Sequence, residues 1–124
     1  MILNEEHQMI RDALRSFSQD RLAPNAGRWD KEHYFPKDEL KELAALGAFG
    51  VAVPEELGGA GLDYVSLALV LEEIAAGDGG TSTIISVNNC PVCSIGMMYA
   101  NAEQKERFLR PLAQGEMLGA FALT

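Results

Sequence analysis

The sequence predicts an all-α fold, a helical bundle of five to six helices with a short extended segment at its C-terminal end. Three observations predict it. Apolar residues recur at helical spacing over most of the chain, residues that favour helix caps precede these stretches, and no convincing strand pattern occurs before residue 116. Because 124 residues are enough to bury one core, we expect a single helical domain over residues 1–115.

The first expected helix begins after Asn4, a residue that favours the N-cap. Apolar residues then recur every three or four positions on the face that includes Leu14. Pro24 should kink or pause this helix, because proline lacks an N–H group and its ring clashes with the preceding turn. We expect a second piece over residues 25–31, with Trp29 as its core anchor.

The next helix is expected to begin at Pro36, since proline suits the first helical position, and to end at Gly47. Residues 51–54 read as extended chain. Residues 55–61 read as a turn, where three glycines indicate positive φ or a close approach of the backbone to another element. No Lys-Ser or Lys-Thr pair follows these glycines, so they do not form a phosphate-binding P-loop.

Two mostly apolar helices follow and are expected to lie at the centre of the bundle. The first has Asp63 as its N-cap and ends near residue 76; the second covers residues 81–99. Asn101 and Gln104 then form a capping box for a last helix over residues 103–110.

The apolar run over residues 83–100 is more consistent with a buried helix than with a membrane span. It is interrupted by polar residues and a proline, namely Asn88, Asn89, Pro91 and Ser94. Each of those polar groups would need a partner inside the lipid. The net charge of −8 argues against nucleic acid or an anionic membrane surface as a partner, since both require a basic patch.

The N-terminal residues 1–6 lack the basic region of a targeting signal and carry two carboxylates instead. We therefore expect a cytoplasmic, bacterial-like protein.

Cys90 and Cys93 have the spacing of a thioredoxin-type redox pair. That chemistry needs a strand before the pair and a helix after it, and here an apolar helical stretch precedes it. Two buried, packing cysteines are the favoured interpretation, with thiol redox chemistry as the alternative. His7 and His33 are distant in the sequence, so no zinc or other metal site is expected.

Residues 116–124 change to an extended, apolar pattern. One strand cannot form a sheet, so its pairing partners are expected to lie outside the chain. We interpret this segment as the first strand of a truncated middle β domain.

Three stretches, in the expected order, resemble the acyl-CoA dehydrogenase family over nearly the whole chain. The first is the turn Pro54-Glu55-Glu56-Leu57-Gly58-Gly59-Ala60-Gly61. The second pairs Leu71-Glu72-Glu73-Ile74-Ala75 with Ser86-Val87-Asn88-Asn89, as in short-chain and bacterial members. The third runs from Glu103-Gln104-Lys105 through Gly115-Glu116 to Ala120-Phe121-Ala122-Leu123-Thr124.

The resemblance implies an N-terminal helical domain of a FAD-dependent enzyme that oxidises an acyl-CoA to the trans-2-enoyl-CoA. In this family a glutamate removes the α proton while the β hydride passes to the flavin. That glutamate lies in or near a C-terminal domain, so no residue here is expected to be catalytic and the chain alone is expected to be inactive. Glu72, Glu73 and Glu116 are interpreted as structural polar residues.

The resemblance also implies two groups of site residues. The expected cofactor-binding residues are Phe121, Leu123 and Thr124. The expected substrate-binding residues, on the wall of the acyl-chain cavity, are Ile84, Val87, Asn88 and Pro91. For the first group the competing interpretation is an ordinary core strand, and for the second it is plain core packing.

The implied partners are an acyl-CoA substrate and an electron acceptor such as electron-transfer flavoprotein, in a homo-oligomeric parent enzyme. Acyl-CoA oxidases and flavin monooxygenase relatives share such a helical domain. The alternative function from another class is a stand-alone helical interaction module without catalysis. A stand-alone module would have its final segment docked or helical, whereas a domain that lacks its neighbours would expose apolar surface.

Overall fold

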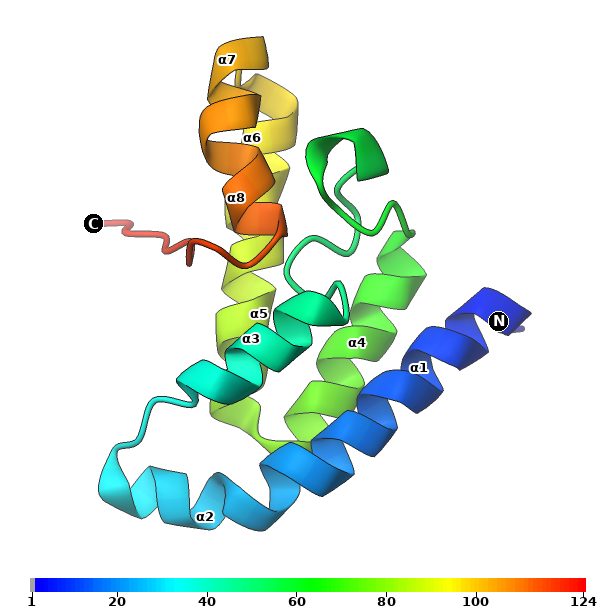
Figure 1. The fold of residues 1–124 in the computed structure, drawn as a ribbon, viewed down its shortest axis with the longest axis vertical. Helices are drawn as coiled ribbons and strands as arrows, with labels where there is room; N and C mark the ends of the chain where they lie inside the picture. Colours follow the sequence, from blue (N-terminus) through cyan, green and yellow to red (C-terminus); the bar gives the residue numbers. More distant parts are fainter. Residues whose placement is uncertain (1) are drawn as a thin grey trace.

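The computed structural model describes residues 2–124, and within that range the chain forms helices and no strand. Five longer helical runs and one short 3-10 turn follow one another (Figure 1). Their bounds are α1 (Glu5–Phe17), η1 (Ser18–Leu22), α2 (Ala23–Glu32), α3 (Lys37–Ala45), η2 (Glu55–Leu57), α4 (Tyr64–Gly77), α5 (Gly79–Val87), η3 (Asn88–Cys93), α6 (Ser94–Tyr99), α7 (Ala102–Gln104), η4 (Lys105–Leu109) and α8 (Arg110–Ala113). The predicted all-α bundle of five to six helices is confirmed.

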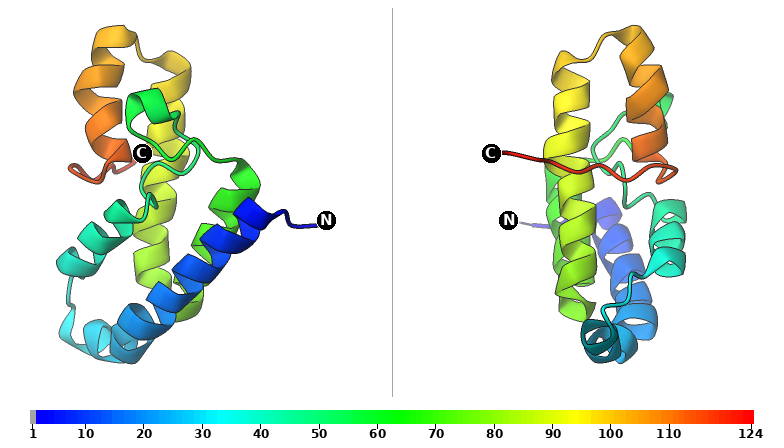
Figure 2. Two further views of the ribbon diagram at one scale, coloured as in Figure 1. Left: turned by 45° about the vertical axis from the view of Figure 1, so that its right-hand side comes forward. Right: turned by 90° about the vertical axis from the view of Figure 1, so that its left-hand side faces the viewer.

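The helices pack as two connected groups. α1 lies along α4, and α4 lies along α5. In the view of Figure 1, α3 lies in front of α4 and α5. α5, η3 and α6 form one long rod, and the run from α7 to α8 returns beside α6. The C-terminal segment crosses this rod where α5 passes into α6, as the right-hand view of Figure 2 shows.

The main core fills the space between α1, α3, α4 and α5. Its buried members are Leu14, Leu22, Trp29, Leu40, Leu43, Ala48, Phe49, Val51, Leu67, Val70, Ile74 and Ile85. A smaller cluster lies where α8 meets the rod and consists of Val53, Cys93, Leu109 and Ala113. Trp29 is 5% exposed and stacks on Tyr34, with 5.7 Å between the ring centroids, which confirms it as a core anchor.

One imidazole links the N-termini of α1 and α4. Asn4 caps α1 by accepting the backbone N–H of His7, and His7 Nδ1 accepts the backbone N–H of Asn4. The other ring nitrogen, His7 Nε2, therefore carries the proton that it donates to Asp63 at 2.8 Å. Asp63 in turn caps α4 by accepting the backbone N–H of Ser66. The predicted caps at Asn4 and Asp63 are confirmed.

Asp63 should make stability depend on pH in the acidic range. The backbone N–H of Ser66 and then the His7 side chain lower the pKa of this carboxyl from 3.8 to about 2. Because this pKa is lower in the folded than in the unfolded chain, the ionised carboxylate stabilises the fold. Its contribution to the free energy of unfolding is fully present above about pH 4 and is lost as the pH falls towards about 2. We expect Asp63→Asn to flatten this fall in the free energy of unfolding, measured by urea denaturation at several acidic pH values. Asp20→Asn, at an exposed site, is the control and should retain the wild-type slope.

The run from α1 to α2 bends without a pause. Pro24 lies in the first turn of α2, where its missing N–H group is tolerated, and the wide turn η1 precedes it. Figure 1 shows the change of direction between α1 and α2. Of the two expected outcomes at Pro24, a kink or a pause, the structure has the bend, and α2 covers Ala23–Glu32 where residues 25–31 were expected.

Three sequence-based boundaries differ from the structure. Residues 51–54, expected to be extended, form turns, because this stretch folds back into the core instead of pairing. The expected helix over residues 81–99 is broken at Cys90 (φ −137°, ψ 109°), since a residue before proline avoids the helical region. The last helical run continues to Ala113, because Pro111 fits the first turn of α8.

The glycine-rich turn has the predicted conformations. Gly58 and Gly61 have φ values of 84° and 65°, in the region that favours glycine. Gly59 has no room for a side chain, because a Cβ atom there would lie 2.0 Å from the carbonyl oxygen of Val53. Among the helices of residues 2–124, none has the length and apolar character needed to cross a membrane.

Candidate functional site at the α5 face and the C-terminal segment

Three of the predicted substrate-binding residues lie in the α5–α6 rod. Ile84 and Val87 are one helical turn apart on α5, Pro91 follows the break at Cys90, and all three are half-buried. Ile84 also lines a surface hollow of about 320 Å³ with Trp29 and Tyr34. This half-exposed apolar wall can contact an acyl chain. Its assignment to substrate binding stays a prediction.

Asn88, the fourth predicted residue, is fully buried and its side chain is engaged by the backbone. Its Nδ2 donates to the carbonyl oxygens of Phe49 at 2.8 Å and Leu112 at 3.1 Å. Its Oδ1 accepts the backbone N–H of Gly119 at 2.9 Å. In this structure Asn88 therefore joins the rod to the loop after α3, to α8 and to the C-terminal segment.

Asn89 has a similar role that the sequence analysis missed. Its Nδ2 donates to the carbonyl oxygens of Ala48 and Ile85, and its Oδ1 accepts the backbone N–H of Val51 at 2.9 Å. Residues 48–51 are buried loop, and buried backbone polar groups need partners. The signal was present in the sequence as two adjacent amides inside an apolar run, which had to be satisfied by something internal.

The predicted cofactor-binding residues lie after Gly119, the residue bonded to Asn88, in an exposed part of the chain. Phe121 is 53% exposed, Leu123 is 82% exposed, and Thr124 is exposed. Among the described residues, none forms a hydrogen bond with residues 120–124. The segment crosses the rod at Asn88 (Figure 2), the residue that follows the predicted wall residue Val87 in the sequence. Contact with a flavin stays a prediction.

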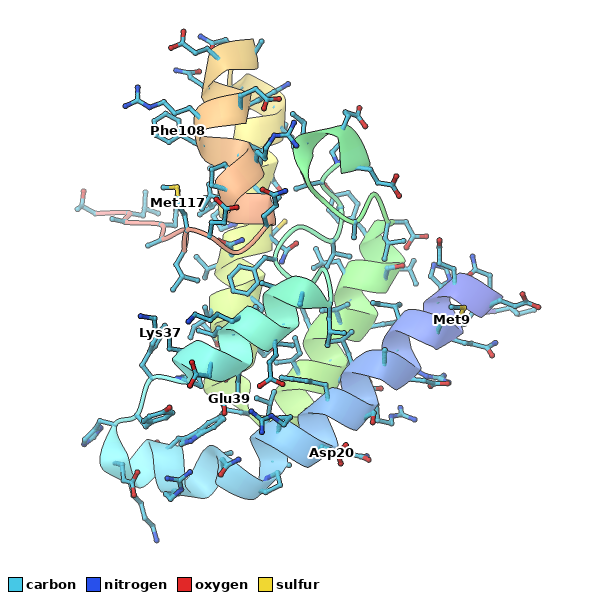
Figure 3. The ribbon with its side chains drawn as sticks, viewed as in Figure 1. Met9, Asp20, Lys37, Glu39, Phe108 and Met117 are labelled. Atoms are coloured by element: carbon cyan, nitrogen blue, oxygen red, sulfur yellow. The ribbon has the colours of Figure 1, made fainter. Side chains whose placement is uncertain are left out.

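The C-terminal segment also borders an apolar hollow of about 200 Å³ beneath α3. Its lining residues are Phe35, Lys37, Leu40, Lys41, Phe49, Gly115, Glu116, Met117 and Leu118. Lys37 and Met117 mark its two sides in Figure 3. Before the segment reaches Asn88, its backbone is thus bonded to α8 and faces α3 across this hollow.

The three carboxylates Glu72, Glu73 and Glu116 differ in their environment. Glu73 is buried, and both of its oxygens accept hydrogen bonds from Arg15, at 2.6 and 3.0 Å. Glu72 and Glu116 are exposed to solvent. Within residues 2–124, no group of three or more His, Cys, Asp and Glu side chains is arranged to hold a metal ion. The interpretation of Glu73 as an inter-helix polar contact agrees with this geometry.

The two cysteines differ in environment. Cys93 is 1% exposed, and burial raises the pKa of its thiol to about 11, which opposes the thiolate that redox chemistry requires. Cys90 is exposed, contrary to the expectation that both cysteines are buried, because the chain leaves the helical path there before Pro91. The geometry favours a packing role for Cys93.

Thiol labelling of the native chain should therefore find one reactive cysteine. We expect Ellman's reagent to modify Cys90 rapidly and Cys93 only after unfolding, and Cys90→Ala to remove the rapid phase. Rapid modification of Cys93 in the folded protein, or an isolated Cys90–Cys93 disulfide that forms and opens reversibly, would support the redox interpretation instead.

Comparison with known proteins gives a family match over most of the chain. Residues 4–116 match the family described as "Acyl-CoA dehydrogenase, N-terminal domain". The chain is similar to the short-chain specific acyl-CoA dehydrogenase of rat mitochondria, with 41% identity over 98% of the chain and 30% of the rat protein. It is also similar to a 3-(aryl)acrylate reductase of Clostridium sporogenes, with 36% identity over 100% of the chain and 33% of that protein.

The fold agrees with the same group of proteins. The butyryl-CoA dehydrogenase of Megasphaera elsdenii superposes with a TM-score of 0.94 at 31% identity, covering 100% of this chain and 33% of the other. The chain thus spans about 30% of the length of the rat relative that it matches.

Proposed function

The chain belongs to the acyl-CoA dehydrogenase family, and on that premise we propose that it is the N-terminal helical domain of a FAD-dependent enzyme that oxidises an acyl-CoA to the trans-2-enoyl-CoA. The named relatives are dehydrogenases and a reductase, so the family is one of oxidoreductases. In the proposed organisation, residues 1–115 form the helical domain and residues 116–124 are the first strand of a middle β domain.

The observation that carries the proposal is the exposed segment after Gly119. Phe121 and Leu123 are large apolar residues at 53% and 82% exposure, a condition that burial against another body would relieve. The backbone groups of residues 120–124 have no partner among the described residues, and the Thr124 hydroxyl is exposed. A flavin ring offers an apolar face and an edge of donors and acceptors, so these groups fit it. A stand-alone interaction module would instead favour a docked or helical segment.

In the proposed enzyme the flavin supplies the hydride acceptor. The residues of this chain bind the cofactor and the substrate and keep water out. Phe121, Leu123 and Thr124 would contact the flavin ring. Ile84, Val87 and Pro91 would form an apolar wall for the acyl chain. Closing such a wall over the substrate removes water and strengthens the electrostatic interactions inside. Because Glu73 is occupied by Arg15, we propose that the base comes from outside these residues.

The partners in this proposal are the acyl-CoA substrate and an electron acceptor such as electron-transfer flavoprotein. We propose a homo-oligomeric parent enzyme in the cytoplasm. No nucleic acid partner is proposed, because the net charge is −8.

A domain exchange tests the proposed function. The chain replaces the matching segment of the rat short-chain enzyme, to which it is 41% identical. We expect the isolated chain to show no turnover with butyryl-CoA and an artificial electron acceptor, and the chimera to bind FAD and to lose its flavin absorbance when butyryl-CoA is added. Turnover by the isolated chain, or a folded chimera without FAD, would contradict the proposal.

A matched pair of variants locates the effect. Leu123→Asp places a charge on the proposed flavin-contacting segment and should abolish FAD binding by the chimera. Met9→Asp changes an apolar residue of similar exposure, 73%, on α1 (Figure 3) and should leave FAD binding unchanged.

A further inference from the structure

Gly119 is the last residue of the chain after α8 that forms a hydrogen bond with the helices among the described residues. Glu116 and Met117 still donate their backbone N–H groups to the carbonyl oxygen of Pro111. Gly119 then donates its N–H to Asn88 Oδ1 at 2.9 Å, and among the described residues no hydrogen bond involves the chain beyond it. The Gly119 amide is therefore where the position of the following residues is set.

Gly119 is held there by shape as well as by its hydrogen bond. A Cβ atom at this position would lie 2.6 Å from Cγ1 of Val92, 2.9 Å from its Cβ and 3.0 Å from its Cγ2. Valine is β-branched and has little rotamer freedom, so it cannot move aside cheaply. Only glycine allows the backbone to come this close to the rod.

The acceptor is as fixed as the donor. Asn88 is fully buried, and its Nδ2 is engaged by the carbonyl oxygens of Phe49 and Leu112, which hold the amide plane in one orientation. With both protons of Nδ2 used, Oδ1 points to Gly119 and has no alternative donor among the described residues.

We propose that Asn88 and Gly119 are positioning residues, whose hydrogen bond and close contact at Val92 set the place at which the flavin-contacting segment leaves the helical body. This inference rests on the proposed function for residues 121–124. Phe121 and Thr124 lie two and five residues beyond the anchor, within about 7–17 Å of it at about 3.3 Å per extended residue. Val87 directly precedes the anchor residue Asn88 in the rod. The wall and the flavin contacts are thereby placed by one rigid junction.

Gly119→Ala tests the anchor in the isolated chain, independently of any flavin. Asn88 is left intact because it also holds the backbone at two other positions. We expect the Gly119 amide of the wild type to exchange at least about tenfold more slowly with solvent deuterium than those of residues 120–124, as judged by NMR. In Gly119→Ala this protection should fall about tenfold. Adding Val92→Ala to Gly119→Ala should restore part of this protection, because the second change removes two of the three atoms that the new methyl group meets.

The same variants in the FAD-loaded chimera test the positioning role. We expect Gly119→Ala to raise the dissociation constant of FAD about tenfold and to shift the flavin absorption bands, while the melting temperature of the apo-protein is unchanged. The double variant Val92→Ala/Gly119→Ala should recover part of the affinity. A merely structural role would change the melting temperature and not the flavin spectrum.

The outcomes separate the two claims. If Gly119 exchanges as fast as residues 120–124 in the wild type, or if Gly119→Ala binds FAD as the wild-type chimera does, the positioning role is wrong. If the wild-type chimera folds and binds no FAD, the proposed function fails, and hydrogen exchange in the isolated chain still decides whether the anchor exists.

Discussion

Replacing Asn89 by alanine is expected to lower the free energy of unfolding by about 2–6 kcal/mol, the largest single effect on stability that we predict. The variant leaves the carbonyl oxygen of Ala48 and the N–H group of Val51, both in buried backbone, without the partner they have, whereas the carbonyl oxygen of Ile85 still accepts the backbone N–H of Asn88. Each buried polar group left unsatisfied costs about 1–3 kcal/mol. Urea denaturation, with the slope of the transition checked for constancy, measures the change.

Asn25→Ala is the matched control for Asn89→Ala. Asn25 also donates from Nδ2 to a carbonyl oxygen, that of Arg21 at 3.0 Å, but on an exposed helix surface where water can replace it. We expect its effect to stay within about 1 kcal/mol. An Asn89→Ala variant as stable as this control would mean that the loop over residues 48–51 does not depend on the amide.

Gly77→Ala should cost about 2–3 kcal/mol, because there is no space for a methyl group where α4 crosses η1. A Cβ atom there would lie 2.1 Å from Oγ of Ser18, 3.0 Å from Cβ of Leu22 and 3.0 Å from the carbonyl oxygen of Ser18. Two of these neighbours are backbone or Cβ atoms, so the helices must separate to make room. Thermal and urea unfolding of the variant measure this cost.

Ser18→Ala provides the rescue for Gly77→Ala. The Ser18 hydroxyl is buried and has no hydrogen-bond partner among residues 2–124, so its removal alone should be neutral or stabilising. In the double variant the closest clash is gone and part of the stability should return, with a coupling energy of about 1 kcal/mol or more. Gly27→Ala, on an α2 face with nothing within 4 Å, should be neutral or slightly stabilising. If Gly27→Ala and Gly77→Ala behave alike, close packing at the crossing is not what selects glycine.

The features of the fold that could be predicted are those encoded locally. The caps at Asn4 and Asp63 and the capping box at Asn101 are set by residues within three positions of one another, and all three are confirmed. The stop at Gly47, with φ of 79°, is of the same kind. These signals need no knowledge of the rest of the molecule.

The features that could not be predicted are contacts between distant parts of the chain. His7 bonds Asp63 across 56 residues, and Asn89 bonds Val51 across 38. Residues 51–54 were expected to be extended and form turns instead, and the backbone N–H of Val51 at their start is bonded to Asn89. At Val51, the hydrogen bond to the side chain of Asn89 outweighs the local preference for extended chain.

The candidate site was predicted through family resemblance rather than through physical pattern. Ile84, Val87 and Pro91 are half-buried residues of the rod, and the segment with Phe121 crosses the rod at Asn88. The structural role of Asn88 could not be predicted, because its three backbone partners lie 24 to 39 residues away in the sequence. Only the folded chain shows that this residue anchors the segment.

A crystal structure of the FAD-loaded chimera tests the central claim most directly, namely that the exposed C-terminal segment is one side of a flavin site built against the α5 face. We predict Thr124 within hydrogen-bond distance of the flavin ring, Phe121 in contact with it, and Gly119 still bonded to Asn88. A structure in which FAD is bound while residues 121–124 lie away from the ring would contradict the account.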